Sequence, residues 1–359
     1  MQSNFSTDCL YFKGNLPCKF HKKDSSTCPR CLHYIKQNKK ILIIKLGRAG
    51  DVVRTAPLFS NLKFMFGSGI KVDFVTNYPD IIKMIDLDWE NYRVIDFKVA
   101  WQLLGKTYDI IINLDKDEEA CSFINNFEGT RYGFFLNSNN KIVCSETFND
   151  IWHFGLDDNF MKEYPYGHTE GLFRAFGLTY YKDRAIWNFN KTNTKKYDLL
   201  LIPNAGTTWE TRCLEYKIWE QIVSFLVNEK RHVGILSSKK EEERKIGESL
   251  QGKFGEFALS ISTNSYQDWF QITNEAKVVL CLPSLGMNIA NQLNIPVVLL
   301  NNIFSPHEFK NDLSNNSIIL SPKRTCLSCY KSKCKSNCLN EIPVLDIYLA
   351  ISKILNKRD

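Results

Sequence analysis

Three short polar segments each follow an apolar run and precede a helical pattern, and each carries side chains that suit acid–base or phosphate chemistry. The first is residues 45–58, KLGRAGDVVRTAPL, in which Gly47, Arg48 and Gly50 form a turn around Asp51. A carboxylate at the start of a helix stabilises that helix by about 1 kcal/mol. A carboxylate at the carboxyl edge of a parallel sheet could also act as a general base. The residues alone favour the capping role and leave the catalytic one open.

The second segment, residues 202–219, reads IPNAGTTWETRCLEYKIW. Its hydroxyls at Thr207 and Thr208, its free backbone N–H groups and the Arg212 guanidinium together suit a phosphate or diphosphate. A surface loop with an incidental arginine is an equally good interpretation of these residues.

The third segment, residues 278–300, runs from an apolar stretch into Ser284, Leu285 and Gly286, where a helix is expected to begin. The first N–H groups of a helix have no partner within it, and the helix dipole favours an anion there. Every strand-to-helix junction has this geometry, so a helix start alone is weak evidence for an anion site. The evidence is stronger here because this loop is expected to face the second segment.

The chain has twelve cysteines, and eight of them lie in two tight groups near its ends. Four thiolates spaced C-x2-C-x4-C-x3-C are typical of a tetrahedral zinc or iron site, and a second group near the amino terminus ends in C-x2-C. Disulfides are the alternative. Neither group offers a general base, so we expect two structural metal sites. His21 and His33 are additional candidate ligands, but we expect them to be surface residues. The predicted ligands are Cys9, Cys18, Cys28 and Cys31 in one site, and Cys326, Cys329, Cys334 and Cys338 in the other.

The elements that position these segments follow from alternating β-rich and helical runs, which predict two doubly wound α/β domains. In the first half, strands are expected at Ile41–Leu46, Ile70–Thr76, Arg93–Phe97 and Tyr108–Leu114, and helices at Val52–Phe66 and Glu118–Asn126. In the second half, strands are expected at Leu199–Pro203, His232–Ser237, Lys277–Leu282 and Pro296–Leu300, and helices at Glu215–Asn228, Lys239–Leu250 and Tyr266–Asn274.

We therefore divide the chain into a cysteine-rich finger over 1–38, a first Rossmann-like domain over 39–180, a polar linker over 181–196 and a second Rossmann-like domain over 197–359. The last of these contains the finger at 326–338 and a closing helix at 343–355. Ligands of such sheets bind at the carboxyl ends of the strands, so a cleft between the two domains is the expected site.

The composition excludes a disordered chain, because 44% of its 359 residues are hydrophobic and 13% are aromatic. No apolar run is long enough for a membrane span, and the first residues do not read as a signal peptide, so we expect a cytoplasmic protein. The net charge of +7 suits anionic ligands without identifying one.

In this order the three segments resemble the signatures of family 9 glycosyltransferases, the ADP-heptose heptosyltransferases. The family's GD-V-x-x-T-x-P turn corresponds to Gly50–Pro57, its G-x-x-W stretch to Gly206–Arg212, and its D-[ST]-x-x-x-H-x-A turn to Pro283–Ala290. The resemblance covers about residues 39–355. It implies a GT-B fold, in which two Rossmann-like domains face a cleft and the second holds most of the donor nucleotide.

The resemblance also implies residue roles. Asp51 matches the general base for the acceptor hydroxyl, in an acceptor-side loop with Gly47, Arg48 and Gly50. Arg212 takes the place of a lysine that contacts the donor diphosphate. Thr207, Thr208 and the backbone of Ser284, Leu285 and Gly286 match phosphate contacts, while Asn264 and Ser265 fall where the family's main chain reads adenine. The implied chemistry is inverting transfer with no metal at the reaction centre.

Two positions depart from the family pattern, because Pro283 stands at the family aspartate and Asn288 at the family histidine. The turn Leu282-Pro283-Ser284 and the carboxyl-terminal cysteines are similar to the heptosyltransferases that modify autotransporter proteins. The acceptor is therefore open between a saccharide and a protein.

We predict a glycosyltransferase that moves a heptose from ADP-heptose, and two alternatives stay open. One is a degenerate GT-B binding or scaffold protein, which the two departures favour. The other is a zinc-finger nucleic-acid-binding protein, favoured by basic residues around the second finger but disfavoured by the absence of recognition-helix spacing. No nucleic-acid partner is expected, and the sequence leaves peripheral membrane association at the inner face of the membrane and oligomerisation open.

Overall fold

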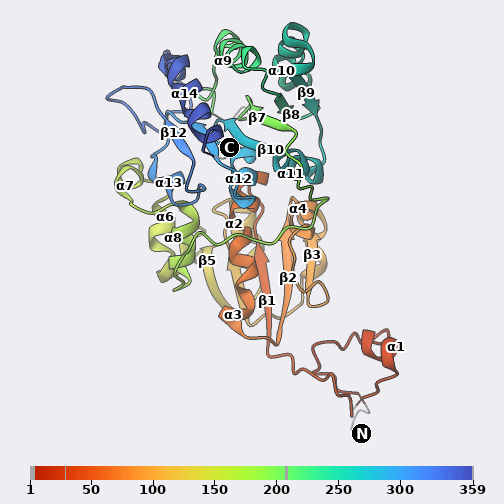
Figure 1. The fold of residues 1–359 in the computed structure, drawn as a ribbon. Helices are drawn as coiled ribbons and strands as arrows, with labels where there is room; N and C mark the ends of the chain where they lie inside the picture. Colours follow the sequence, from red (N-terminus) through yellow and green to blue (C-terminus); the bar gives the residue numbers. More distant parts are fainter. Residues whose placement is uncertain (1–4, 29, 207–208, 358–359) are drawn as a thin grey trace. The chain divides into compact units, whose positions relative to one another are not determined.

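The structure, a computed structural model, describes residues 5–28, 30–206 and 209–357, and it contains two six-stranded sheets (Figure 1). The chain divides into two compact units: unit 1 comprises residues 1–48 and 56–152, and unit 2 comprises residues 49–55 and 153–359. The division passes through the helix that carries Asp51. It also groups the helices of residues 153–175 with the second sheet, whereas the sequence places them before the linker.

The sheet of unit 1 has the strand order β3-β2-β1-β4-β5-β6, in which only β6 runs antiparallel to its neighbour. Its strands are β1 (Lys39–Ile44), β2 (Ile70–Thr76), β3 (Tyr92–Asp96), β4 (Ile110–Asn113), β5 (Thr130–Leu136) and β6 (Ile142–Cys144). The helices of this half of the chain are α1 (Lys19–Asp24), α2 (Ala49–Ser60), α3 (Leu62–Phe66), α4 (Pro79–Lys83), α5 (Glu118–Ile124) and α6 (Asn149–His153).

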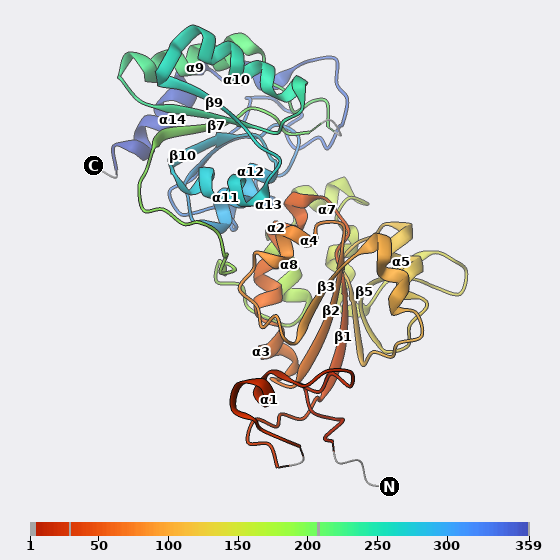
Figure 2. The same cartoon turned by 90° about the vertical axis from the view of Figure 1, so that its right-hand side faces the viewer.

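Strand β1 is apolar over Ile41–Ile44 because helices cover both faces of the sheet, as in parallel sheets generally. Figure 2 shows α2 and α5 on opposite faces. On the α2 side, Phe59 packs edge-on against Phe74 with ring centroids 4.6 Å apart. On the other side, Leu42 and Ile44 belong to a buried cluster with Ile124 of α5.

The sheet of unit 2 is entirely parallel, with the order β12-β11-β10-β7-β8-β9. Its strands are β7 (Tyr197–Ile202), β8 (Val233–Ser237), β9 (Ala258–Ser262), β10 (Ala276–Cys281), β11 (Val297–Leu300) and β12 (Ile318–Leu320). The helices are α7 (Asp158–Glu163), α8 (His168–Ala175), α9 (Tyr216–Asn228), α10 (Glu241–Phe254), α11 (Tyr266–Asn274), α12 (Leu285–Gln292), α13 (His307–Lys310) and α14 (Val344–Leu355).

In unit 2, α9 and α10 cover one face of the sheet and α11 and α12 cover the other (Figure 2). The first face is closed by α14, whose Ile347 and Ile351 share a buried cluster with Trp219 of α9 and Leu280 of β10. The closing helix predicted from the sequence is thus part of this core rather than an appendage.

Each sheet reverses its strand order once, between β1 and β4 in unit 1 and between β7 and β10 in unit 2. Loops that leave the carboxyl ends of two such neighbours diverge to opposite faces, which opens a crevice where ligands of this fold class bind. The segment that carries Asp51 follows β1. Those that carry Arg212 and Ser284 follow β7 and β10.

Two sequence predictions need correction. The helix expected over Val52–Phe66 begins earlier, at Ala49, and is interrupted at Asn61, whose side-chain amide donates to the Pro57 carbonyl at 2.9 Å. Strands β5, β6, β9 and β12 were not predicted. In the described part of the chain, no helix has the length and apolarity that a membrane span requires.

Candidate functional site

The β1–α2 junction presents Asp51 in the first turn of α2, where the helix dipole favours a carboxylate. Asp51 does not cap the helix: Arg48 occupies the N-cap position, without a side-chain cap bond. Instead, Oδ1 of Asp51 accepts a hydrogen bond of 2.8 Å from Nη2 of Arg54, one turn further along. The Asp51 side chain is 38% exposed, and no described residue bonds to its Oδ2. This carboxylate could therefore accept a proton from a bound hydroxyl.

A buried ion pair holds the turn that leads to Asp51. The Nζ of Lys45 and a carboxylate oxygen of Asp115 are in contact, and each side chain is only 6% exposed. The other carboxylate oxygen accepts from the backbone N–H groups of Leu46 and Gly47, the latter at 3.1 Å. Asp115 follows β4, so it reaches across the reversal point of the sheet to β1. Sequence reasoning missed this pair because 70 residues separate its members and no motif joins them.

Asn113, the last residue of β4, fixes the position of Asp115. Its side-chain amide donates to the carbonyls of Asp115 and Phe134, both at 2.9 Å, and its Oδ1 accepts from the Asp115 N–H at 3.1 Å. A glycine is required opposite, because a Cβ on Gly133 would lie 1.8 Å from the Asn113 carbonyl oxygen, and Gly133 has φ = +92°. Hydrogen bonds within the protein therefore fix the carboxyl edge of this sheet without a ligand.

Lys116 lies at the same edge and was also missed by the sequence analysis. Its Nζ donates to the Trp152 carbonyl at 2.5 Å and lies 5.2 Å from the centroid of the Phe134 ring. Burial lowers the pKa of Lys116 to about 8, because removal from water penalises the ammonium form. The carboxyl edge of unit 1 thus carries a lysine that can exchange its proton close to neutral pH.

In unit 2, Arg212 joins the two loops that flank the reversal point. Its Nη1 donates to the Pro283 carbonyl of the β10–α12 loop, and its Nη2 donates to the Ala205 carbonyl of the β7–α9 loop at 2.6 Å. The guanidinium also lies 5.7 Å from the ring of Phe304. Arg212 is where the sequence places it, beside the start of α12, but part of its hydrogen-bonding capacity holds the loops in place. Thr207 and Thr208 of the same loop lie outside the described residues.

The start of α12 carries Ser284 at its N-cap position. The Ser284 hydroxyl is buried and has no hydrogen-bond partner among the residues that the structure describes, which is uncommon for a buried polar atom. Gly286 lets the helix approach the sheet, because a Cβ there would lie 2.4 Å from Cδ1 of the buried Ile202. Unsatisfied N–H groups, a spare hydroxyl and the nearby Arg212 form a local site that suits an anion.

Asn264 and Ser265 follow β9 at the same edge of the sheet but at its outer end. The Ser265 hydroxyl accepts from the Asp268 N–H at 3.2 Å and caps α11, and Oδ1 of Asn264 accepts from the Lys239 N–H at 3.1 Å. Both side chains serve local structure, so a contact with a nucleoside from this loop would come from the main chain.

The carboxyl-terminal cysteine segment packs against the β7–α9 loop. Thr211 donates from Oγ1 to the Lys331 carbonyl at 2.9 Å and from its N–H to the Ser332 carbonyl at 3.3 Å. Asn302 donates to the Thr211 carbonyl at 2.9 Å and to the Cys338 sulfur at 3.4 Å. A cavity of about 500 Å³ lies between the loop and the segment. The segment therefore supports the loop that carries Arg212.

The twelve cysteines are free thiols, and in the described part of the chain no group of three or more metal-ligating side chains is close enough to hold a metal ion. In the amino-terminal segment, Nε2 of His33 lies 2.8 Å from an Asp24 oxygen, and its ring stacks on Phe20. The arrangement does not assemble either four-cysteine site, so the zinc or iron prediction rests on spacing alone.

Apart from the cysteines, the predicted residues that the structure describes lie in four loops at carboxyl edges of strands or at the helix starts that follow them. Gly47, Arg48, Gly50 and Asp51 belong to one loop and helix start, and Arg212 lies beside the loop that carries Ser284. Asn264 and Ser265 lie at the outer end of the second sheet.

No protein-family model and no curated protein matches this chain. Solved structures do match. E. coli heptosyltransferase WaaC with ADP aligns with a TM-score of 0.63 at 15% identity, over 88% of this chain and 99% of that one. A family 9 glycosyltransferase from Veillonella parvula gives 0.61 at 12% identity, over 89% and 98%. The iron-containing dodecameric glycosyltransferase TibC from enterotoxigenic E. coli gives 0.56 at 10% identity, over 90% and 78%. The two Rossmann-like sheets of this chain therefore have the GT-B fold found in the family 9 heptosyltransferases.

Proposed function

We propose that the chain is an inverting glycosyltransferase that moves a heptose from ADP-heptose to a saccharide or protein acceptor. The observation that carries the proposal is the local site in unit 2, where the start of α12 meets Arg212 and the Ser284 hydroxyl, which has no hydrogen-bond partner among the described residues. The fold match to WaaC with ADP, and to TibC in complex with ADP-D-beta-D-heptose, supports ADP-heptose as the donor.

In the proposed mechanism the donor diphosphate binds at the start of α12. The N–H groups of that helix and the Arg212 guanidinium stabilise the negative charge that develops as the diphosphate leaves, which is commonly the largest contribution to such catalysis. One guanidinium could serve both the loop carbonyls and the diphosphate, because it has five N–H donors.

Asp51 takes the proton of the acceptor hydroxyl as its oxygen attacks the anomeric carbon. Arg54 holds one oxygen of the carboxylate through its hydrogen bond to Oδ1, and no described residue bonds to the other oxygen. The anomeric configuration inverts because attack and departure occur on opposite faces of the sugar.

The test measures transfer from ADP-heptose with wild type, Asp51→Asn and a matched control, Asp80→Asn. Asp80 is an exposed carboxylate in the first turn of α4, the helix that follows β2. Loss of a general base lowers rates by about 10²–10⁴, so Asp51→Asn should lose at least a hundredfold in kcat while ADP affinity stays within twofold. Asp80→Asn should behave as wild type.

The scaffold alternative makes the opposite prediction. If the chain is a degenerate GT-B protein, wild type transfers no sugar and Asp51→Asn binds its partners as wild type does. If wild type transfers the sugar and Asp51→Asn does so at the same rate, the chain is a glycosyltransferase but Asp51 is not its general base.

A further inference from the structure

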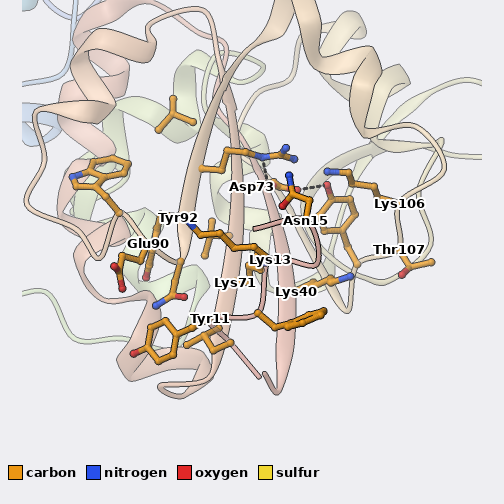
Figure 3. Close-up of a pocket in the computed structure, with 18 of the residues that line it drawn as sticks. Tyr11, Lys13, Asn15, Lys40, Lys71, Asp73, Glu90, Tyr92, Lys106 and Thr107 are labelled. Carbon is orange, nitrogen blue, oxygen red and sulfur yellow. Dashed lines mark hydrogen bonds and ion pairs between the residues drawn. The ribbon is translucent and has the colours of Figure 1, made fainter. Parts of the chain in front are cut away.

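Unit 1 contains a cavity of about 1120 Å³ that no part of the proposed reaction uses (Figure 3). One wall is the amino-terminal segment, including Tyr11 and Lys13, and the other is the edge of the sheet where β1, β2 and β3 begin, at Lys40, Lys71 and Tyr92. This is the amino edge of the strands. A strand of six residues spans roughly 20 Å, so the cavity lies about that far from the carboxyl edge of the same sheet.

The walls carry far more positive than negative charge. Among the described residues, seven lysines and arginines line the cavity, against two carboxylates. Both carboxylates are already paired: Glu90 contacts Lys19, and Asp73 accepts from Arg93 Nε at 2.8 Å and from the Tyr108 hydroxyl at 2.7 Å. The remaining five ammonium groups form no ion pair with described residues; they belong to Lys13, Lys40, Lys71, Lys83 and Lys106.

The five lysines that form no ion pair with described residues come from separate parts of the chain that converge on one space. Lys40 and Lys71 are partners in the β1–β2 register, so their backbones are adjacent, and Lys106 precedes β4. Burial lowers the pKa of Lys106, the Asp73 carboxylate opposes that shift, and the positive charges of Arg93, Lys40 and Lys71 add to it. Like charges held together repel unless an anion neutralises them, and a concave wall concentrates their field.

We propose that this cavity binds an anion that carries two or more phosphate groups. Lysine binds phosphate as a point charge, and five such charges around one cavity match several phosphates better than a single carboxylate. The volume accommodates a ligand of that size. The phosphates can belong to a soluble molecule or to lipid headgroups, and the two sources are separated by experiment. The site is independent of the donor site in unit 2.

The test compares two triple variants that lose the same charge. Lys40→Gln/Lys71→Gln/Lys106→Gln removes three cavity ammonium groups, and Lys162→Gln/Lys191→Gln/Lys217→Gln removes three exposed ones elsewhere, so each lowers the net charge from +7 to +4. Binding of inorganic tripolyphosphate is measured by calorimetry at two salt concentrations. Binding to vesicles is measured by co-sedimentation, with phosphatidylcholine alone and with added phosphatidic acid.

We expect wild type to bind at least one probe, tripolyphosphate or the phosphatidic acid vesicles, with an affinity that falls as salt rises. The cavity variant should bind that probe at least about tenfold more weakly and the control within about twofold. Tripolyphosphate binding points to a soluble ligand, and binding to acidic vesicles alone points to headgroups. Equal weakening in both variants, or no binding of either probe by wild type, would overturn the proposal. If the triple variant melts early, Lys13→Gln/Lys106→Gln gives the same comparison at two exposed positions.

Discussion

The ion pair between Lys45 and Asp115 gives the sharpest test of how the first loop is held. Asp115→Asn removes the negative charge and leaves the Lys45 ammonium buried without compensation, with a side chain that is only 6% exposed. Breaking a buried pair from one side typically costs about 3–5 kcal/mol. Asn keeps an oxygen for the Leu46 and Gly47 N–H groups but as a neutral acceptor, which weakens both bonds. The expected loss for unit 1 is therefore about 3 kcal/mol or more.

The same reasoning predicts rescue. Lys45→Met/Asp115→Asn removes both charges, and replacing a whole buried pair with neutral groups is often nearly neutral in free energy. We expect the double variant to recover at least about 2 kcal/mol relative to Asp115→Asn. A coupling of that size between adjacent residues would show that the pair, and not general packing, carries the effect.

Hydrogen exchange in urea, read by mass spectrometry on peptides that cover β1, reports the stability of unit 1 separately from unit 2. A loss of 3 kcal/mol corresponds to roughly a hundredfold larger open population. The reasoning is refuted if Asp115→Asn lies within about 1 kcal/mol of wild type. It is also refuted if adding Lys45→Met makes the loss larger.

Three further predictions concern unit 2. Gly286→Ala would place a Cβ 2.4 Å from Ile202 Cδ1, so it should destabilise by about 1–3 kcal/mol in thermal unfolding and weaken ADP binding. Burial raises the pKa of Asp312 to about 6. The folded state therefore keeps a proton that the unfolded state releases near pH 4, so wild type loses stability as the pH rises from 4 to 6. Asp312→Asn does not titrate, so its stability relative to wild type should increase over that range and level off above pH 6. The largest difference should be about 3 kcal/mol. Finally, elemental mass spectrometry of the purified wild type should find zinc or iron, and the double variant Cys329→Ser/Cys334→Ser should contain less of that metal. Equal metal content in wild type and variant would contradict a metal site at the carboxyl-terminal cysteines.

The strands that could be predicted from sequence are the four central strands of the second sheet and β1 to β4 of the first, of which only β3 lies at an edge. The run Ile41–Ile44 is apolar throughout because helices bury both faces of β1, and β10 is similar. The strands that were missed lie toward the edges. In β9 only Ala258 is fully buried, so polar residues break its pattern, and β12 has just three residues.

The candidate site was predictable where its residues are contiguous and hidden where they are not. Asp51 and Ser284 were found because each directly follows an apolar strand. Asp115 could not be assigned to the turn at Lys45, because only the β1–β4 pairing brings them together. Likewise, the sequence indicates a guanidinium near a helix start but not that Arg212 holds the Pro283 carbonyl.

The central claim, that unit 2 holds an adenine-linked sugar donor, is tested most directly by thermal unfolding of the protein with ADP, UDP, GDP, CMP and a random oligonucleotide. A ligand at about a hundred times its dissociation constant adds ~2.7 kcal/mol, which raises the midpoint by several degrees. We predict a shift with ADP alone, smaller in Arg212→Lys, since lysine keeps the charge but cannot bridge both loops. A shift with UDP or GDP instead would contradict the heptose donor. A shift with the oligonucleotide alone, or no shift with any ligand, would contradict the proposal that the chain is a glycosyltransferase.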